Sequence, residues 1–278
     1  YSCKVRASDS TVTPTFMPKT DFFVNMPKTG QRDIIIQDDM TSFRVYDNSG
    51  KDGFYFTNDD GKLLLTAPED CMMKVSGYVK LMYTSAEEDY LDIYDGSSTN
   101  AKRLGRFRGY KNSSTTSVTA SSSTNQMLLH FISNGYGYVK DGGGVYLTVS
   151  VIKRFTSSDI TVAAIEDQTY TGSRICPAIS VTDGEKVLEP GVDFTTQCSN
   201  NISVGTASMT ITGKGHYTGG ISKQFKIAKA PLMVIAKDKS IIYGDKPANA
   251  GVEYAGFLGG DKENSLSGSI VYSYDYAQ

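Results

Sequence analysis

Apolar and polar residues alternate with a period of two along most of the chain. Across residues 73–83 apolar side chains occupy the odd positions, whereas Lys74, Ser76 and Lys80 occupy even ones. Residues 206–212 repeat the pattern, with Thr and Ser between Ala, Met and Ile. Such alternation is typical of half-buried antiparallel strands. No window of eleven or more residues carries apolar residues at helical spacing, so the sequence predicts an all-β protein.

Turn signals separate the alternating runs. Glycine follows aspartate at Asp60-Gly61, Asp95-Gly96 and Asp183-Gly184, and glycine adopts the positive φ angles of tight turns without steric penalty. Many short strands separated by such turns predict antiparallel β-sandwiches.

Shifts in composition divide the chain. The segment 153–159 lacks regular alternation, and so does Lys229-Ala230-Pro231, so we expect both to be linkers between modules. The segments predicted on this basis are an irregular N-terminal segment (1–20), a first β-sandwich domain (21–152), a second β-sandwich domain (159–228) and a third, related segment (230–278).

An internal repeat supports the boundary near residue 230. The repeated residues lie 72 positions apart: Val162 and Val234, Ala164 and Ala236, Gly172 and Gly244. Self-similarity at a fixed period is the signature of tandem modules. Only 49 residues follow Lys229, so we expect the last repeat to be incomplete in this sequence.

Charge and composition exclude several functions. Lys and Arg number 28 against 30 Asp and Glu, for a net charge of −2, which argues against nucleic acid or an anionic membrane as partner. Apolar runs are too short to cross a bilayer. Two histidines and four scattered cysteines exclude common zinc sites, and no G-x-S-x-G motif is present. We therefore predict a protein that is not an enzyme, with structural roles for His130 in a strand and His216 in a turn.

Tyrosines are the remaining candidates for ligand chemistry, because the chain has 18 Tyr and no Trp. Tyr136 and Tyr138 flank Gly137 in a loop at one end of the predicted sandwich, and Tyr110 lies in another loop. Binding residues concentrate on loops held by a rigid scaffold. These tyrosines form either a ligand-binding surface or a scattered, half-buried set.

The first β region carries motifs of a known family. They are "FRVYDNSGKDGFYFTNDDGKLLLTAPED" (43–70), "EDYLDIYDGSS" (88–98) and "TASSSTNQMLLHFISNG" (119–135). These residues resemble a CUB-type domain over about 39–152. Their sequence is more similar to CUB-like modules of bacterial surface proteins than to those of animal complement proteases. The resemblance implies an antiparallel β-sandwich of an extracellular protein. The physical reading of the strand agrees, because alternation predicts that Leu91 and Ile93 face the core while Asp92 and Tyr94 face outward.

The resemblance also raises the question of calcium, which many CUB domains bind. Asp89 matches one family ligand, Asn134 stands at a position where the family has Asp, and Glu88 could replace a Glu that has no clear counterpart. A hard cation wants six to eight oxygen ligands with several carboxylates among them. Two interpretations stay open: a calcium site formed by Glu88, Asp89 and Asn134, or a solvated acidic turn with no cofactor.

The second β region resembles the bacterial immunoglobulin-like repeats of long surface proteins. The matching stretches are "PAISVTDGEKVLEPGVDF" (177–194) and "GTASMTITGKGHYTGG" (205–220). Residues 230–276 resemble a related repeat that usually follows in tandem. Such repeats typically act as stalks that carry another module away from a cell surface.

The cysteines divide unevenly between the regions. Cys176 and Cys198 both stand where the repeat family more often has other residues. A bond between them would close a 22-residue loop, and exported proteins meet oxidising conditions. The alternative is two buried thiols. A bond between Cys3 and Cys71 is a weaker option.

Together these patterns predict a segment of a secreted or cell-surface bacterial protein with an adhesin-like function. The expected partners are a host or environmental protein or glycan, besides neighbouring modules of the same chain. The alternative is a set of accessory modules of a secreted hydrolase, a peptidase or glycosidase, whose catalytic domain lies outside this segment.

Overall fold

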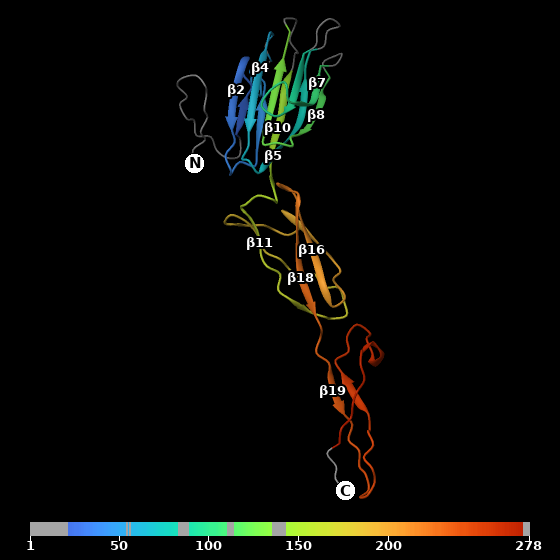
Figure 1. Cartoon of the computed structure of the whole chain (residues 1–278). Coiled ribbons are helices and arrows are strands. Elements are labelled where there is room, and N and C mark those ends of the chain that lie inside the picture. The colour runs from blue at the N-terminus through green and yellow to red at the C-terminus, as the bar shows by residue number, and fades with distance from the viewer. Residues whose placement is uncertain are drawn as a thin grey trace. The chain divides into compact units, whose positions relative to one another are not determined.

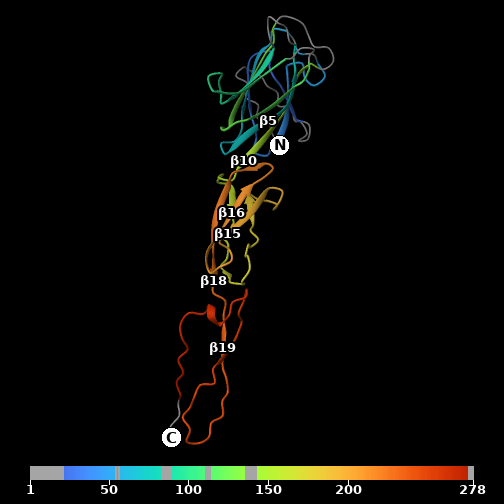
Figure 2. The same cartoon turned by 90° about the vertical axis from the view of Figure 1, so that its right-hand side faces the viewer.

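The computed structural model consists of strands and one short 3₁₀ segment, η2 (Glu263–Ser265), within the described residues (Figures 1 and 2). The chain forms two compact units. The first comprises Tyr1–Ser158 together with Gly191–Asp193 and Gly213–Gly219, and the second comprises the remainder. The described residues are 22–53, 55, 57–82, 89–109, 114–134 and 143–274.

One sheet of the first unit has the strand order β1-β3-β10-β5-β8, with β17 beside β10. Its two long strands, β10 and β5, pair antiparallel from Gly144 opposite Lys80 to Lys153 opposite Cys71. The strands are β1 (Phe23–Asn25), β3 (Ser42–Tyr46), β5 (Cys71–Lys80), β8 (Thr116–Ser121), β10 (Gly144–Arg154) and β17 (Tyr217–Thr218).

The other sheet of the first unit has the strand order β2-β4-β9-β6-β7. The pairing of β6 with β7 shifts register between Ile93 and Tyr94. The strands are β2 (Thr29–Ile35), β4 (Asp60–Thr66), β6 (Tyr90–Asp95), β7 (Lys102–Arg108) and β9 (Gln126–Ile132).

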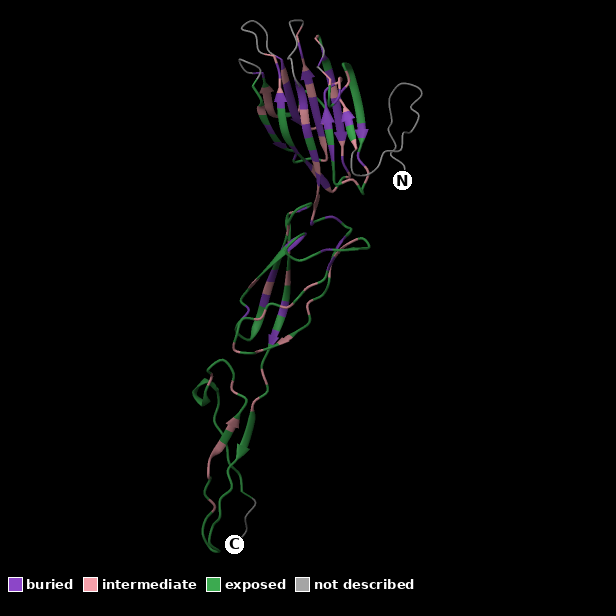
Figure 3. Cartoon of the chain, turned by 180° about the vertical axis from the view of Figure 1, so that it is seen from behind, coloured by how far each residue is buried: buried purple, intermediate pink, exposed green. Residues whose placement is uncertain are grey.

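The core of the first unit takes alternate residues from both sheets. Val75 and Val79 of β5 and Leu63 and Leu65 of β4 have no exposed surface and belong to one apolar cluster. The intervening Ser76 is exposed, and Figure 3 shows bands of buried and exposed residues along strands of the first unit. Period-two alternation therefore places one face of each sheet in the core. The predicted all-β sandwich is confirmed.

Asp60-Gly61 is not a turn, contrary to the prediction. Both residues lie in β4, and Gly61 pairs with Gly30 of the parallel strand β2. A Cβ atom on Gly61 would overlap the carbonyl oxygen of Pro27. Glycine is therefore required here because the backbone of Pro27 approaches closely, which is another common reason for a glycine in a strand.

The predicted linker after residue 152 is wrong for its first residues, which belong to the first unit. Phe155 has no exposed surface, and its ring lies edge-on to that of Tyr217 with centroids 5.8 Å apart. The amide of Lys153 donates to the carbonyl oxygen of His216 over 2.8 Å. A Cβ atom on Gly213 would lie 2.8 Å from the Phe155 ring. The turn that contains His216 thus encloses Phe155, although it lies far along the chain.

The second unit contains three small sheets among the described residues, and two of them, β11-β13-β14 and β12-β18-β16-β15, lie in its first part. Val181, Phe194, Met209 and Ile211 have no exposed surface and come from both sheets. The strands are β11 (Ile160–Val162), β12 (Gln168–Thr169), β13 (Val181–Asp183), β14 (Lys186–Val187), β15 (Phe194–Ser199), β16 (Gly205–Gly213) and β18 (Gly220–Ala228).

The last part of the second unit repeats one pairing of the first part. Strands β19 (Met233–Ala236) and β20 (Val252–Ala255) pair antiparallel with Val234 opposite Tyr254, and β11 and β13 pair antiparallel with Val162 opposite Val181. The partner of Val234 lies one residue beyond the position that a 72-residue offset from Val181 gives. Every residue in 229–274 is at least partly exposed (green and pink in Figure 3). No second sheet covers β19 and β20 among the described residues.

Replacing Phe155 by Ala should destabilise the first unit by about 3 to 5 kcal/mol, because it empties a fully buried ring site. Guanidinium denaturation of the whole chain, with hydrogen exchange of the β10 amides to identify the first unit, measures the loss. Val187→Ala removes a side chain that is 68% exposed and is the control. Equal losses in the two variants would contradict the enclosure of Phe155.

Candidate functional site

One buried carboxylate, Asp89, connects four segments at one end of the first sandwich. Asp89 lies directly before β6 and is 1% exposed. Its Oδ2 accepts a hydrogen bond from the Tyr55 hydroxyl (2.6 Å), and its Oδ1 accepts one from the Asn134 amide (2.8 Å). The Tyr55 oxygen in turn accepts from the amide of Met82 (2.6 Å). The Asp89 carbonyl oxygen accepts from the amide of Gly109 (3.2 Å).

Burial controls the electrostatics of this network. Burial raises the pKa of Asp89, and the hydrogen bonds from Tyr55 and Asn134 offset only part of that effect. Burial also raises the pKa of Tyr55, as do the hydrogen bond to Asp89 and the negative charge of Asp89. Tyr55 therefore remains a neutral donor, and its role is to hold Asp89 in place.

Asp47 is a second buried carboxylate, and it stabilises the turn after β3. Its Oδ1 accepts from the amide of Ser49 (2.9 Å) and its Oδ2 from the amide of Val145 (2.9 Å). Burial raises the pKa of Asp47, and these hydrogen bonds lower it by less. Because both oxygens have partners, the geometry gives Asp47 a structural role.

Asp59 has fewer hydrogen-bond partners than Asp89 or Asp47 among the described residues. Its Oδ1 lies 3.3 Å from the donating Nδ2 of Asn48, whereas its Oδ2 and the Oδ1 of Asn48 have no hydrogen-bond partner among the described residues. Burial raises the pKa of Asp59 to about 7, although the charge of Lys28 lowers it. The charge of Asp59 therefore changes near neutral pH.

The predicted calcium ligands lie only partly within the described residues. Of the predicted ligands, Glu88 lies outside the described residues, and Asn134 contributes its backbone amide to Asp89. Both oxygens of Asp89 already accept protein hydrogen bonds. No group of three or more His, Cys, Asp or Glu in the described part of the chain could hold a metal ion.

The predicted ligand-binding tyrosines, Tyr110, Tyr136 and Tyr138, lie outside the described residues. Their neighbours are described. Tyr110 directly follows Gly109, and Tyr136 comes two residues after Asn134. Both of these neighbours are hydrogen-bonded to Asp89. The two segments that carry the tyrosines therefore leave the sandwich from points held by the same residue.

A charged network covers the outer face of the β6–β7 pair. Its central residue is Arg106, which the sequence patterns did not identify. Arg106 donates from Nε and Nη2 to the two carboxylate oxygens of Asp92 at 2.7 and 2.6 Å. Its guanidinium carbon also lies 3.9 Å from the centroid of the Tyr90 ring. Asp92 faces outward as predicted but is only 1% exposed. Cross-strand register is the feature that would have identified Arg106, because it places Arg106 opposite Asp92.

Burial would raise the pKa of Asp92, but the hydrogen bonds from Arg106 and Tyr94 and the charges of Arg106 and Arg103 together lower it. This carboxylate therefore stays ionised beneath its partners and stabilises the sheet.

His130 has a structural partner on the same sheet. Its Nε2 lies 2.6 Å from Oδ1 of Asp60, and this hydrogen bond lowers the pKa of Asp60.

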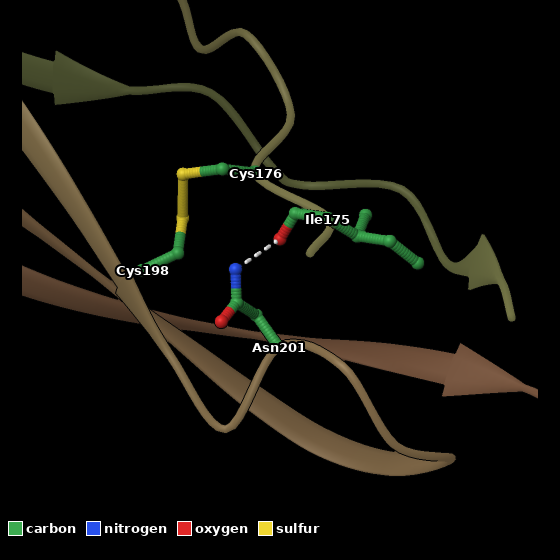
Figure 4. Close-up of a disulfide and its surroundings, with 4 residues drawn as sticks. All are labelled: Ile175, Cys176, Cys198 and Asn201. Carbon is green, nitrogen blue, oxygen red and sulfur yellow. Dashed lines mark hydrogen bonds between the residues drawn. A yellow bond between two sulfur atoms is a disulfide. The ribbon is translucent and has the colours of Figure 1, made fainter. Parts of the chain in front are cut away.

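Cys176 and Cys198 form a disulfide in the second unit, with S–S 2.01 Å and Cα–Cα 5.8 Å (Figure 4). Beside it, Asn201 Nδ2 donates to the carbonyl oxygen of Ile175 over 2.9 Å, and the Ile175 amide donates back to the Asn201 carbonyl oxygen. These bonds hold the segment before β13 against the end of β15.

Cys71 is a buried thiol whose pKa burial raises to about 12. Such a thiol is inert near neutral pH. Cys3, its predicted alternative partner, lies outside the described residues.

Comparison with known proteins assigns part of the first sandwich. Residues 73–141 match the CUB domain. The matched segment contains Asp89, Gly109 and Asn134 and both tyrosine-bearing segments, and we refer to the first sandwich that includes it as the CUB-like module. No match to a curated protein is found.

Among solved structures, the CUB1-EGF-CUB2 domains of rat MASP-1 are 13% identical, with 84% of this chain and 88% of that chain covered and a TM-score of 0.35. The CUB1-EGF-CUB2 domain of human MASP-1/3 is 10% identical, with 80% and 87% covered and a TM-score of 0.34. TM-scores this low do not indicate a shared overall arrangement.

Tyr55→Phe should lower the stability of the CUB-like module by about 1 to 3 kcal/mol, because it leaves Asp89 Oδ2 and the Met82 amide without their partner. Tyr243→Phe removes the same hydroxyl from a side chain that is 92% exposed. Urea denaturation of both variants tests the difference. A cost for Tyr55→Phe no larger than that of the control would show that the hydroxyl does not hold Asp89.

Asp59→Asn should change how stability depends on pH. The raised pKa means that Asp59 favours the folded state at low pH, and that this contribution is lost as pH rises from about 4 to about 7. The amide does not titrate, so the variant should gain stability relative to the natural chain over this range, on the order of 2 kcal/mol.

Thermal melts at pH 4.5 and pH 7.5 measure this change. Asp60→Asn is the matched control, and its effect on stability should have the opposite sign. The pKa of Asp60 is lowered, so the ionised side chain stabilises the folded state above about pH 4, and the variant should lose this contribution. Parallel melting curves for Asp59→Asn and the natural chain would contradict the assigned burial of Asp59.

Proposed function

We propose that this chain is a non-catalytic segment of a secreted or cell-surface bacterial protein with an adhesin-like function. The CUB-like module, residues 21–152, binds the ligand, a protein or a glycan. The immunoglobulin-like repeats, 159–228 and 230–278, carry that module away from the surface. CUB domains are non-catalytic recognition modules of extracellular proteins, and the match to residues 73–141 is the observation that supports the proposal.

The hydrogen bonds of Asp89 support a ligand site at the loop end of the module. Its carbonyl oxygen holds Gly109, and its carboxylate holds Asn134. Tyr110, Tyr136 and Tyr138 follow these two anchors in sequence. A scaffold that fixes where a loop begins reduces the entropy lost when the loop binds a ligand.

The repeated strand pairing supports the role given to the second unit. The β19–β20 pair is antiparallel like the β11–β13 pair, with a one-residue shift in register, and this similarity supports tandem modules. The Cys176–Cys198 disulfide is compatible with export, because disulfides persist in oxidising compartments. Among the described residues, no helix has the length and apolar character to span a membrane.

The test is a binding screen of the whole 278-residue chain against arrays of glycans and extracellular proteins. Saturable binding to at least one ligand is expected, and Tyr136→Ala or Tyr138→Ala should weaken it on the order of tenfold. Tyr243→Ala, in a different part of the chain and 92% exposed, should leave it unchanged. Absence of binding to every protein and glycan would overturn the proposed function.

A further inference from the structure

Three tyrosines form a row across the outer face of the β3-β10-β5 sheet in the CUB-like module. Tyr146 of β10 lies directly opposite Tyr46 of β3 on one side and Tyr78 of β5 on the other. The Tyr146 ring stacks on that of Tyr78 with centroids 4.9 Å apart, and it meets Tyr46 edge-on at 5.9 Å. Phe23 of β1 extends the row, 5.9 Å from Tyr46.

This aromatic row points away from the core. The sequence neighbours of its members, Val45, Leu147 and Val79, belong to the core cluster, and the four aromatic residues do not. Tyr78 and Phe23 at its two ends are each 41% exposed, whereas Tyr46 between them is 5% exposed. Cross-strand aromatic pairs stabilise a sheet by less than about 1 kcal/mol each. Sheet stability alone therefore gives little reason for leaving the two end rings exposed to water.

Two polar rows lie beside the aromatic row on the same face. Residues two apart on a strand share a face, so each row is offset by about 7 Å. The rows are Arg44, Thr148, Ser76 and Thr119, and then Ser42, Ser150, Lys74 and Ser121. Their hydroxyl groups both donate and accept hydrogen bonds.

The charges of these rows have one sign. Arg44 and Lys74 are cationic, and no carboxylate occurs in either row. Arg44 Nη1 lies 3.5 Å from the Tyr46 hydroxyl, which places a cation next to the aromatic row. The face therefore complements a ligand that has an apolar ring surface, many hydroxyl groups and negative charge.

We propose that this outer sheet face is a binding site for an acidic polysaccharide. A pyranose ring has an apolar C–H face that stacks on tyrosine, while its hydroxyl groups meet Ser76, Thr148 and Thr119. The carboxylate or sulfate groups of the polymer meet Arg44 and Lys74. The inference rests on the proposed recognition function, and it names the ligand class and assigns it to residues of β3, β5, β8 and β10.

The experiment uses the whole chain and three polymers: polygalacturonate, heparin and, as the neutral control, dextran. Biolayer interferometry should show binding to an acidic polymer that weakens with salt, because exposed charges are screened. Tyr78→Leu keeps an apolar side chain in the sheet and should weaken this binding on the order of tenfold. Lys74→Gln should weaken it and reduce its salt dependence. Tyr243→Leu should have no effect, since it is exposed on a different unit.

Thermal melts of each variant show whether the fold is retained. If Tyr78→Leu does not fold, Lys74→Gln and Ser76→Ala, both at exposed positions, keep the test decisive. Dextran binding as tight as that of the acidic polymers would overturn the assigned charge. Binding to a glycan or protein that Tyr136→Ala abolishes and Tyr78→Leu leaves intact would overturn the sheet-face site but not the recognition function. Absence of binding to any protein or glycan would overturn both.

Discussion

The free-energy cost of burying the Asp89 carboxylate dominates the organisation of one end of the CUB-like module. A buried carboxylate without hydrogen bonds would be strongly destabilising, so the loops must bring donors to it. Tyr55 and Asn134 do so, and Gly109 bonds to the Asp89 carbonyl oxygen. One residue thereby fixes where two tyrosine-bearing segments leave the sandwich. The proposed loop site depends on this constraint more than on any surface feature.

The outward-facing side chains of the two sheets differ in how they are satisfied. On the β6–β7 face, Arg106 covers Asp92, and the buried charge is compensated within the sheet. On the β10–β5 face, Tyr78 and Tyr146 stack while part of their ring surface remains in water. A charge pair satisfied internally leaves little for a ligand, whereas exposed rings beside hydroxyl groups can still gain from binding.

The sequence patterns predicted much of the fold for a simple reason: alternation depends on each strand alone. Leu91 and Ile93 are fully buried, as their positions in β6 predict. Errors arose where a residue's role depends on a distant segment. Gly61 was taken for a turn because Asp-Gly is a turn signal, but the carbonyl of Pro27 explains it. Phe155 was placed in a linker because its partner, Tyr217, lies in another part of the sequence.

The sequence by itself determined the all-β class, the outward direction of Asp92 and Tyr94, and the motif that contains Asp89, because period-two burial and short motifs are local properties of the chain. Only the tertiary structure decided what each outward or polar side chain meets. Register across the sheets placed Tyr146 between Tyr46 and Tyr78 and Arg106 over Asp92. Such partnerships depend on strand order and pairing, which alternation along a single strand does not encode.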